Sequence, residues 1–219
     1  MSLLLFHADL DGPAGAADCL DEAERLRVAR KRDALQGRRQ QAALVFVRQC
    51  LARCFAFDPA QLPLRRAANG KPQIDPAGWQ ALGRSDPPPQ YSLSHCGGHA
   101  LLAIADCAVG VDLEARIQQT RPALAARVLA AEAFQAWQAL DPDQQIDALT
   151  VAWVRKEAVL KASGLGLGFG LRRLEPGWGD GPVRIDLGRH GCWQVHDVEA
   201  PEGHRAALAL PAEGLHTFQ

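Results

Sequence analysis

The chain has 219 residues, of which 47% are hydrophobic and 22% are charged, and its formal net charge is −1. This composition is typical of a globular chain with a hydrophobic core, and the length suits one large domain or two of about 100 residues each. The near-neutral charge excludes a global attraction to nucleic acid or to an anionic membrane, so any anion-binding site must be local.

The first half of the chain alternates between apolar segments and proline-rich connections. Residues 3–7 have the pattern of an opening strand, and residues 20–55 form a long helical zone without proline, with Gly37 as a candidate break. After several prolines, residues 91–95 predict a short strand that ends in a glycine turn. Residues 99–105 predict a buried strand, because they are almost continuously apolar.

The second half mixes strands and helices in the same way. Residues 109–114 predict a strand that returns beside the preceding one as a hairpin. Residues 122–140 and 148–163 have helical periodicity, and Gly164 closes the second of these helices. The tail predicts further strands at residues 183–187, 193–198 and 206–210.

A weak internal echo links two strands that each follow a glycine. Residues 99–104 read HALLAI and residues 204–209 read HRAALA, one near the end of each half. This echo suits two similar α+β halves joined near residue 108.

The compartment signals favour a cytoplasmic chain. The six cysteines include no CxxC pair, so we expect reduced thiols and no zinc site. The apolar residues 3–6 lack a basic leader, and no apolar run approaches the length of a membrane span. We therefore expect a cytoplasmic protein with no membrane partner.

Two acidic residues, Asp112 and Glu114, lie in the sequence GVDLE. On a strand they share one face, while Val111 and Leu113 point the other way and enter the core. Neighbouring carboxylates repel each other, so a cation between them is favourable, and ligands that are all oxygen suit magnesium. The alternative is a solvated strand end with two surface acids.

A second cluster occupies the sequence WVRKEAVLKASG. Trp153, Glu157 and Lys161 are four residues apart, so they form one stripe along a helix. Glu157 ahead of Lys161 is also the favoured order of an ordinary surface ion pair, worth about 0.3–0.5 kcal/mol. The spacing alone leaves both interpretations open.

Two glycine turns present basic side chains. The sequence NGKP presents Lys71 at a tight turn, and SHCGG places His95 at the mouth of another. Each of these sequences alone is more typical of an ordinary tight turn than of a binding site.

Taken in order, GKP, SH before glycine, GVDLE and WVRKEAVLKASGLGL resemble the 4′-phosphopantetheinyl transferases of the surfactin-synthetase-activator type. The family pattern GxDxE is followed by WxxKEAxxKxxG, which this chain matches at Trp153, Lys156, Glu157, Ala158, Lys161 and Gly164. The resemblance covers most of the chain. It implies an α+β fold, a pseudo-dimer of two similar α/β halves, each with an antiparallel sheet packed on helices, and an active site at their interface.

The implied reaction moves the 4′-phosphopantetheine group of coenzyme A onto a serine hydroxyl of an acyl- or peptidyl-carrier protein and releases 3′,5′-ADP. Through the resemblance, Asp112, Glu114 and Glu157 are the ligands of Mg²⁺, for which Mn²⁺ can substitute. Glu157 or a metal-bound water is the base that activates the serine, and Lys161 assists the departing 3′,5′-ADP.

The resemblance also implies binding residues. Residues 1–108 are expected to bind the nucleotide of coenzyme A, and residues 109–219 to carry the metal acids and the catalytic helix. The expected contacts to coenzyme A are Arg27, Arg39, Lys71, Ser94, His95, Lys156 and Lys161. The expected contacts to the carrier are Arg116, Ile117, Arg121, Arg127, Val128 and Leu129. The carriers of polyketide, nonribosomal peptide or fatty acid synthesis are expected as transient partners of a monomer that binds no nucleic acid.

Two alternatives share some of these residues. A Mg²⁺-dependent pyrophosphohydrolase acting on coenzyme A or a nucleotide would use the same acids but no carrier. A coenzyme A-binding or carrier-binding module without activity would not need them, and the presence of Asp112, Glu114, Glu157 and Lys161 disfavours it.

Overall fold

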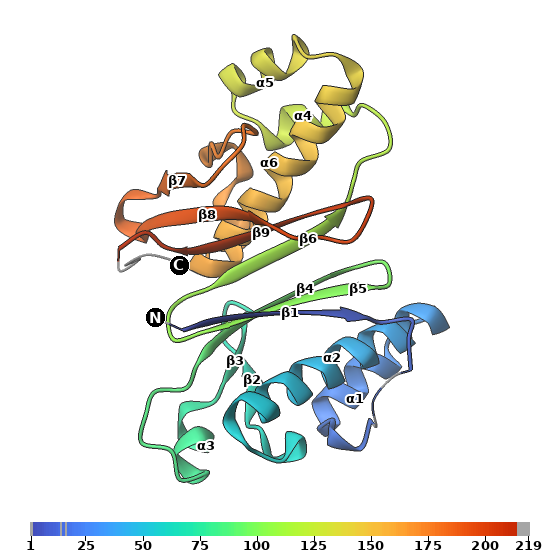
Figure 1. The fold of residues 1–219 in the computed structure, drawn as a ribbon, viewed down its shortest axis with the longest axis vertical. Helices are drawn as coiled ribbons and strands as arrows, with labels where there is room; N and C mark the ends of the chain where they lie inside the picture. The colour runs from blue at the N-terminus through green and yellow to red at the C-terminus, as the bar shows by residue number, and fades with distance from the viewer. Residues whose placement is uncertain (1, 14, 16, 214–219) are drawn as a thin grey trace.

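The computed structural model describes residues 2–13, 15 and 17–213, and it has an α+β architecture of antiparallel sheets covered by helices (Figure 1). The strands are β1 (Leu3–Asp9), β2 (Leu64–Arg66), β3 (Pro72–Ile74), β4 (Gln90–Cys96), β5 (His99–Ala105), β6 (Gly110–Ala115), β7 (Val183–Asp186), β8 (Cys192–Val198) and β9 (His204–Pro211). The helices are α1 (Glu22–Ala29), α2 (Ala34–Phe55), α3 (Pro76–Ala81), α4 (Pro122–Val128), α5 (Ala131–Gln138) and α6 (Pro142–Ser163). No helix in the described ranges is both long and apolar enough to cross a membrane.

The N-terminal part is built on a sheet with the strand order β1-β5-β4. The long helix α2 lies along this sheet, with α1 beside it (Figure 1). Leu51 of α2, Trp79 of α3 and Leu102 of β5 belong to one buried cluster, and each of these residues is 0% exposed. Burial of such large apolar side chains contributes about 1.5–3 kcal/mol each, so this cluster holds α2 on the sheet.

The C-terminal part is built on a second sheet with the strand order β6-β9-β8-β7, and α6 lies across this sheet (Figure 1). Val159 of α6 and Val195 of β8 are fully buried in their common cluster. Asp141 caps the beginning of α6 by accepting a hydrogen bond from the Gln144 backbone, and Gly164 ends the helix in the left-handed conformation, with φ of 72°.

The two sheets share a core where they meet. Leu101 of β5, Val111 and Leu113 of β6, and Leu208 of β9 lie in one buried cluster. Strand β6 also contacts β4 of the first sheet. The strand that carries the acidic pair therefore lies between the sheet of the N-terminal part and helix α6.

Most predicted strands are confirmed, and the strand predicted at residues 99–105 has the bounds of β5. The predicted hairpin between residues 99–105 and 109–114 is wrong, because β6 pairs with β9 and not with β5. The two strands of the sequence echo, β5 and β9, are both present, and the ring centroids of His99 and His204 lie 5.0 Å apart.

The observed helices differ more from the predicted ones than the strands do. The zone at residues 20–55 is broken between α1 and α2 and not at Gly37, because Asp33 accepts a hydrogen bond from the Gln36 backbone and starts a new helix. The zone at residues 122–140 is likewise two helices, and the last predicted helix begins earlier, at Pro142.

Candidate active site

Strand β6 places its acidic side chains on one face, as its alternation predicts. Val111 and Leu113 are fully buried in the core shared by the two sheets. Asp112 and Glu114 point the other way, toward α6 and the end of β4, and only 2% of Asp112 is exposed. The interpretation of the acidic pair as a solvated strand end is therefore wrong for Asp112.

Gly110 allows β6 to touch α6 directly. A methyl group on Gly110 would overlap with the backbone oxygen of Ala158 and the backbone nitrogen of Ala162. Only glycine leaves room for this approach of strand and helix. The contact brings the acids of β6 opposite the helix stripe that the sequence predicted.

The stripe of α6 faces those acids. Lys161 Nζ donates hydrogen bonds to Asp112 Oδ1 at 2.6 Å and to Ser94 Oγ at 2.9 Å. Trp153, two turns earlier, lines a small hollow together with Glu114. Lys161 thus forms its ion pair with Asp112 of β6. The interpretation of Glu157 and Lys161 as an ordinary surface ion pair does not account for this contact.

The carboxylates of the site affect one another. Burial, followed by the negative charge of Asp112, raises the pKa values of both Glu114 and Glu157. Asp112 Oδ2 is buried and has no hydrogen-bond partner, whereas Oδ1 accepts from Lys161 and from Ser94 Oγ at 2.9 Å. A buried carboxylate oxygen without a partner is costly, and a cation would satisfy it.

These observations fit a divalent cation with oxygen ligands. The available donors of Asp112, Glu114 and Glu157 are all carboxylate oxygens, which magnesium prefers. Across residues 2–13, 15 and 17–213, no three His, Cys, Asp or Glu side chains are gathered as a ready metal cluster. The three acids therefore share one region of the structure and do not form a preassembled shell.

A hollow of about 250 Å³ opens beside this region. Glu157, Leu160 and Lys161 of α6 form one wall, and Lys71 and Tyr91 of the N-terminal part form another. The site is thus lined by both parts of the chain.

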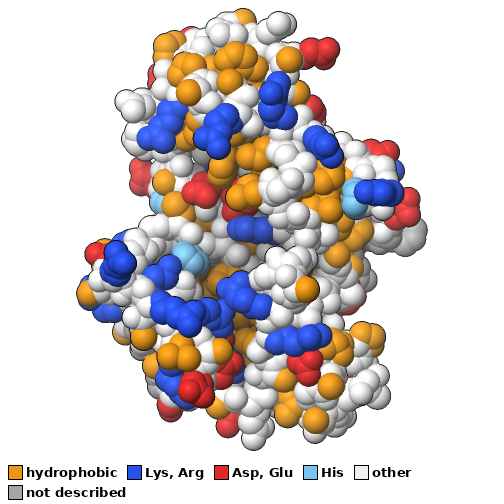
Figure 2. All heavy atoms as spheres, turned by 180° about the vertical axis from the view of Figure 1, so that it is seen from behind, with side chains coloured by type: hydrophobic (Ala, Val, Ile, Leu, Met, Phe, Trp, Pro, Cys, Tyr) orange, Lys and Arg blue, Asp and Glu red, His pale blue; other side chains and the backbone are white. Residues whose placement is uncertain are grey.

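A second, more basic hollow of about 660 Å³ continues from the first, since Pro72, Tyr91 and Leu93 line both. On the face seen in Figure 2, Lys and Arg side chains gather over the lower, N-terminal part of the molecule. The basic residues that line the second hollow are Arg27, Arg30, Arg65, Arg66 and His95. The near-neutral chain therefore gathers basic side chains locally around this hollow.

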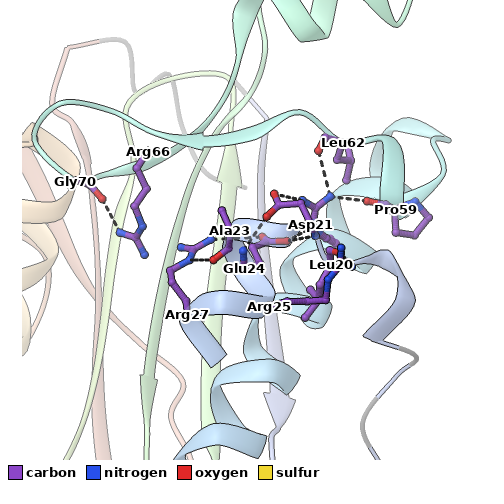
Figure 3. A network of polar contacts seen from close by, with 11 residues as sticks. Leu20, Asp21, Ala23, Glu24, Arg25, Arg27, Pro59, Leu62, Arg66 and Gly70 are labelled. Atoms are coloured by element: carbon purple, nitrogen blue, oxygen red, sulfur yellow. Dashed lines mark hydrogen bonds and ion pairs between the residues drawn. The ribbon is translucent and has the colours of Figure 1, made fainter. Parts of the chain in front are cut away.

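A buried ion-pair network holds α1 at the rim of this hollow. Arg48 of α2 donates to Glu24 at 2.7 Å and to Asp21 at 2.9 Å, and both Arg48 and Glu24 are almost fully buried. Figure 3 shows this network beside Arg27 and Arg66, whose side chains come from α1 and β2 and extend into the same space. The network fixes the helix that carries Arg27.

Ser94 and His95 are consecutive residues of β4 whose side chains serve different regions. Ser94 links Lys161 to Asp112 by hydrogen bonds, so it belongs to the acidic region. Desolvation, followed by the positive charges of Lys161 and Lys31, lowers the pKa of His95. His95 faces the basic hollow and is surrounded by cations.

Lys156 does not reach the site, which corrects its predicted contact with coenzyme A. Its side chain is fully buried, and Nζ donates to the backbone oxygens of Val128 at 2.7 Å and Leu171 at 3.1 Å. Glu175 forms an ion pair with it at 3.6 Å. Lys156 is next to Glu157 in sequence, so its side chain lies on another side of the helix.

Arg39 also lies outside the hollow. Its guanidinium makes a two-pronged ion pair with Asp11 at 2.7 and 2.5 Å, and Arg39 does not line the hollow that contains Arg27. Sequence reasoning missed Arg30, Arg65 and Arg66. The only local signal for the last two was the arginine pair that precedes the glycine turn.

Some of the predicted carrier contacts are buried and others are exposed. Val128 and Leu129 are 0% and 1% exposed and belong to the core beneath α6, so they cannot contact a carrier. Arg121 and Arg127 are exposed on α4. The two remaining contacts are Arg116, which pairs with Asp147 at 3.5 Å, and Ile117, which lines a separate hollow of about 150 Å³ beside Glu114.

Comparison with known proteins gives concordant matches. The family model described as the 4′-phosphopantetheinyl transferase superfamily matches residues 108–209. The chain is 28% identical over 178 residues to the 4′-phosphopantetheinyl transferase psf-1 of Bacillus pumilus, covering 81% of this chain and 69% of the relative. It is 26% identical to the human L-aminoadipate-semialdehyde dehydrogenase-phosphopantetheinyl transferase, covering 77% of this chain and 60% of the relative.

A third relative is the phosphopantetheinyl transferase of a Thraustochytrium species, which is 31% identical over 173 residues. This match covers 70% of the chain but 56% of the relative. The chain thus spans between about half and about two thirds of the length of these relatives. The matches confirm the resemblance that the ordered motifs indicated.

Proposed function

Because the chain is related to the 4′-phosphopantetheinyl transferases, we propose that it transfers the phosphopantetheine group of coenzyme A to a serine of a carrier protein and releases 3′,5′-ADP. The observation that carries this proposal is the pairing of Lys161 with the buried Asp112, beside a hollow that continues into a basic one. Coenzyme A carries a diphosphate and a further phosphate. Basic side chains can bind these phosphates, and acidic side chains can hold a metal ion against the diphosphate.

The acids of the site are suited to a divalent ion. Asp112, through its unpartnered Oδ2, together with Glu114 and Glu157, would hold Mg²⁺. When bound, the ion neutralises the charge that develops on the diphosphate during attack. The raised pKa values of the two glutamates support this set, because both would gain from a cation placed among them.

Glu157 and Lys161 have separate chemical tasks. A serine hydroxyl is a weak nucleophile at neutral pH and requires a base. Glu157 lines the hollow beside Lys161 and is the proposed base. Lys161 lines the same hollow and, when released from Asp112 Oδ1, can neutralise the departing 3′,5′-ADP.

The basic hollow is the proposed site of the nucleotide end of coenzyme A. Arg27, Arg30, Arg66 and His95 line it, and guanidinium groups bind phosphate with two parallel hydrogen bonds. Arg66 already donates to the Gly70 backbone at 2.7 Å, so part of its side chain is held in place for binding.

The fold supports a more detailed proposal about the two parts of the chain. We propose that residues 1–108 and 109–219 are equivalent halves of a pseudo-dimer and that the active site lies at their interface. The equivalent strand pairs β1 with β5 and β6 with β9, and the equally long helices α2 and α6, support this. A chain that contains both halves would act as a cytoplasmic monomer.

The carrier is proposed to dock on the C-terminal half. Arg121 and Arg127 are exposed, and Ile117 lines a small hollow next to Glu114. Carriers of acyl or peptidyl chains present acidic surfaces around their serine, which suits exposed arginines. Of the predicted contacts, these three and Arg116 remain accessible candidates.

The proposal is tested by mixing the protein with coenzyme A, Mg²⁺ and an apo carrier protein. Intact-mass measurement should show a carrier that gains one phosphopantetheine group, with 3′,5′-ADP released in equal amount. A serine-to-alanine carrier is the control and should gain nothing. Steady 3′,5′-ADP release without a carrier would instead identify a pyrophosphohydrolase, and binding without any product would identify an inactive binding module.

A further inference from the structure

The turn at residues 67–71 makes direct contacts with the C-terminal part of the chain. Asn69 Nδ2 donates to the backbone oxygen of Gly164 at 2.9 Å. Lys71 Nζ donates to the backbone oxygen of Ala162 at 3.1 Å and to that of Val109 at 3.3 Å. The acceptors are the end of α6 and the residue immediately ahead of β6.

The end of α6 needs partners of this kind. The last carbonyl groups of a helix have no acceptor role within the helix, and a cation near them is favoured by the helix dipole. Ala162 is in the last turn of α6, so the ammonium of Lys71 caps it. A methyl group on Gly164 would lie 2.7 Å from Asn69 Nδ2, which shows how closely the amide packs on the residue that ends the helix.

Lys71 binds at the point where β6 and α6 touch. Val109 precedes Gly110, and Gly110 is the residue that lets the strand approach Ala162. The ammonium therefore bridges the carbonyls of two segments at their contact. Asp112 follows on one segment, and Lys161 precedes Ala162 on the other.

We propose that Lys71 and Asn69 are positioning residues that pin the end of α6 to the start of β6 and so set Lys161 and Glu157 against Asp112. This inference rests on the proposed function for its effect on catalysis. Lys71 then acts through α6, and a direct bond from its ammonium to coenzyme A is not required. Two of its three N–H donors already have backbone acceptors.

Burial supports this assignment. Lys71 is half-buried, two backbone oxygens hold its ammonium, and desolvation lowers its pKa. In the absence of its ligand, a lysine that binds phosphate in an open hollow would keep its ammonium group in solvent. The same turn also lines the hollow next to Glu157, so the segment that pins α6 is in contact with the space proposed for the substrate.

The test compares Lys71→Met and Asn69→Ala with the matched control Ala68→Ser, which changes an exposed residue of the same turn. Hydrogen–deuterium exchange of residues 159–166, measured without coenzyme A, reports the pinning of α6 whether or not the protein is an active transferase. Steady-state kinetics with an apo carrier then separates kcat from KM for coenzyme A.

Both variants should exchange faster at the end of α6 than the wild type and the control. Misplacement of catalytic groups should lower kcat on the order of 10-fold, with KM for coenzyme A changed less than about twofold. Unchanged exchange in both variants, or a raised KM for Lys71→Met at unchanged exchange and kcat, would overturn the proposal. If Lys71→Met does not fold, Asn69→Ala alone decides, because its hydrogen bond is exposed.

Discussion

Lys161 Nζ lies 2.6 Å from Asp112 Oδ1, while the other oxygen of the same buried carboxylate has no hydrogen-bond partner. Residues 49 positions apart in sequence are thereby joined across the contact between α6 and β6. The carboxylate is satisfied on one side by an ammonium and is available on the other. This arrangement suits a site that takes up a second cation together with an anionic substrate.

The close approach at Gly110 should make this residue indispensable for stability. Gly110→Ala places a methyl group against the backbone of Ala158 and Ala162, which cannot move aside as a side chain would. We expect a loss of about 1–3 kcal/mol or more in the free energy of unfolding, measured by urea denaturation. Gly168→Ala is the matched control, since nothing lies within 4 Å of its added methyl group, and it should unfold like the wild type. Equal stability of the two variants would contradict the contact.

Lys156 should prove structural, although it belongs to the motif that indicates the family. Lys156→Met leaves the backbone oxygens of Val128 and Leu171 without their buried donor. We expect destabilisation of about 1–3 kcal/mol in chemical denaturation, with KM for coenzyme A unchanged in the folded fraction. A raised KM with wild-type stability would restore Lys156 to the binding site.

Arg66 and Arg39 should differ in their effect on coenzyme A. Arg66 lines the basic hollow, whereas Arg39 is held by Asp11 outside it. Arg66→Ala should raise KM for coenzyme A by about 10-fold, the effect of losing one hydrogen bond to a charged group. Arg39→Ala should leave KM near the wild-type value. The opposite order would place the nucleotide at Arg39.

Coenzyme A binding should depend on pH through His95. Its lowered pKa means that the folded, ligand-free protein binds fewer protons here than the unfolded chain, so this group costs stability as the pH falls through the usual histidine range. A phosphate nearby would favour the charged imidazolium and raise the pKa again. Binding should therefore take up protons and become tighter as the pH is lowered from about 8 to about 6.5.

Calorimetry in buffers of different ionisation enthalpy measures this proton uptake. The wild type should take up a fraction of a proton near neutral pH, and His95→Gln should take up less. Identical uptake by both proteins would show that His95 does not face a phosphate.

The sequence patterns predicted local structure well where one face or one run determined it. The strand of residues 99–105 was predictable because it is apolar almost throughout, and the stripe of Glu157 and Lys161 followed from helical spacing. The partner of β6 was not predictable, because a short apolar strand contains no information about which strand it pairs with. The pairing with β9 spans most of the C-terminal part of the chain.

The site was predictable in its acids and less so in its cations. Asp112 and Lys161 lie in specific motifs, and the structure joins them directly. Arg30 at the end of α1 and Arg66 of β2 line one hollow only through the tertiary fold, which no local pattern encodes. Lys156 was misassigned because the motif names the residue but not the side of the helix on which it lies.

The most direct test of the central claim is the intact mass of an apo carrier after incubation with coenzyme A and either the wild-type protein or Asp112→Asn, with and without Mg²⁺. We expect a phosphopantetheine-modified carrier only for the wild type with Mg²⁺, and a rate at least about 100-fold lower for the folded Asp112→Asn protein. Asp180→Asn, which alters an exposed aspartate that lines neither hollow, is the matched control and should retain transfer. Transfer by Asp112→Asn at the wild-type rate, or equal transfer after Mg²⁺ is removed by a chelator, would contradict the central claim.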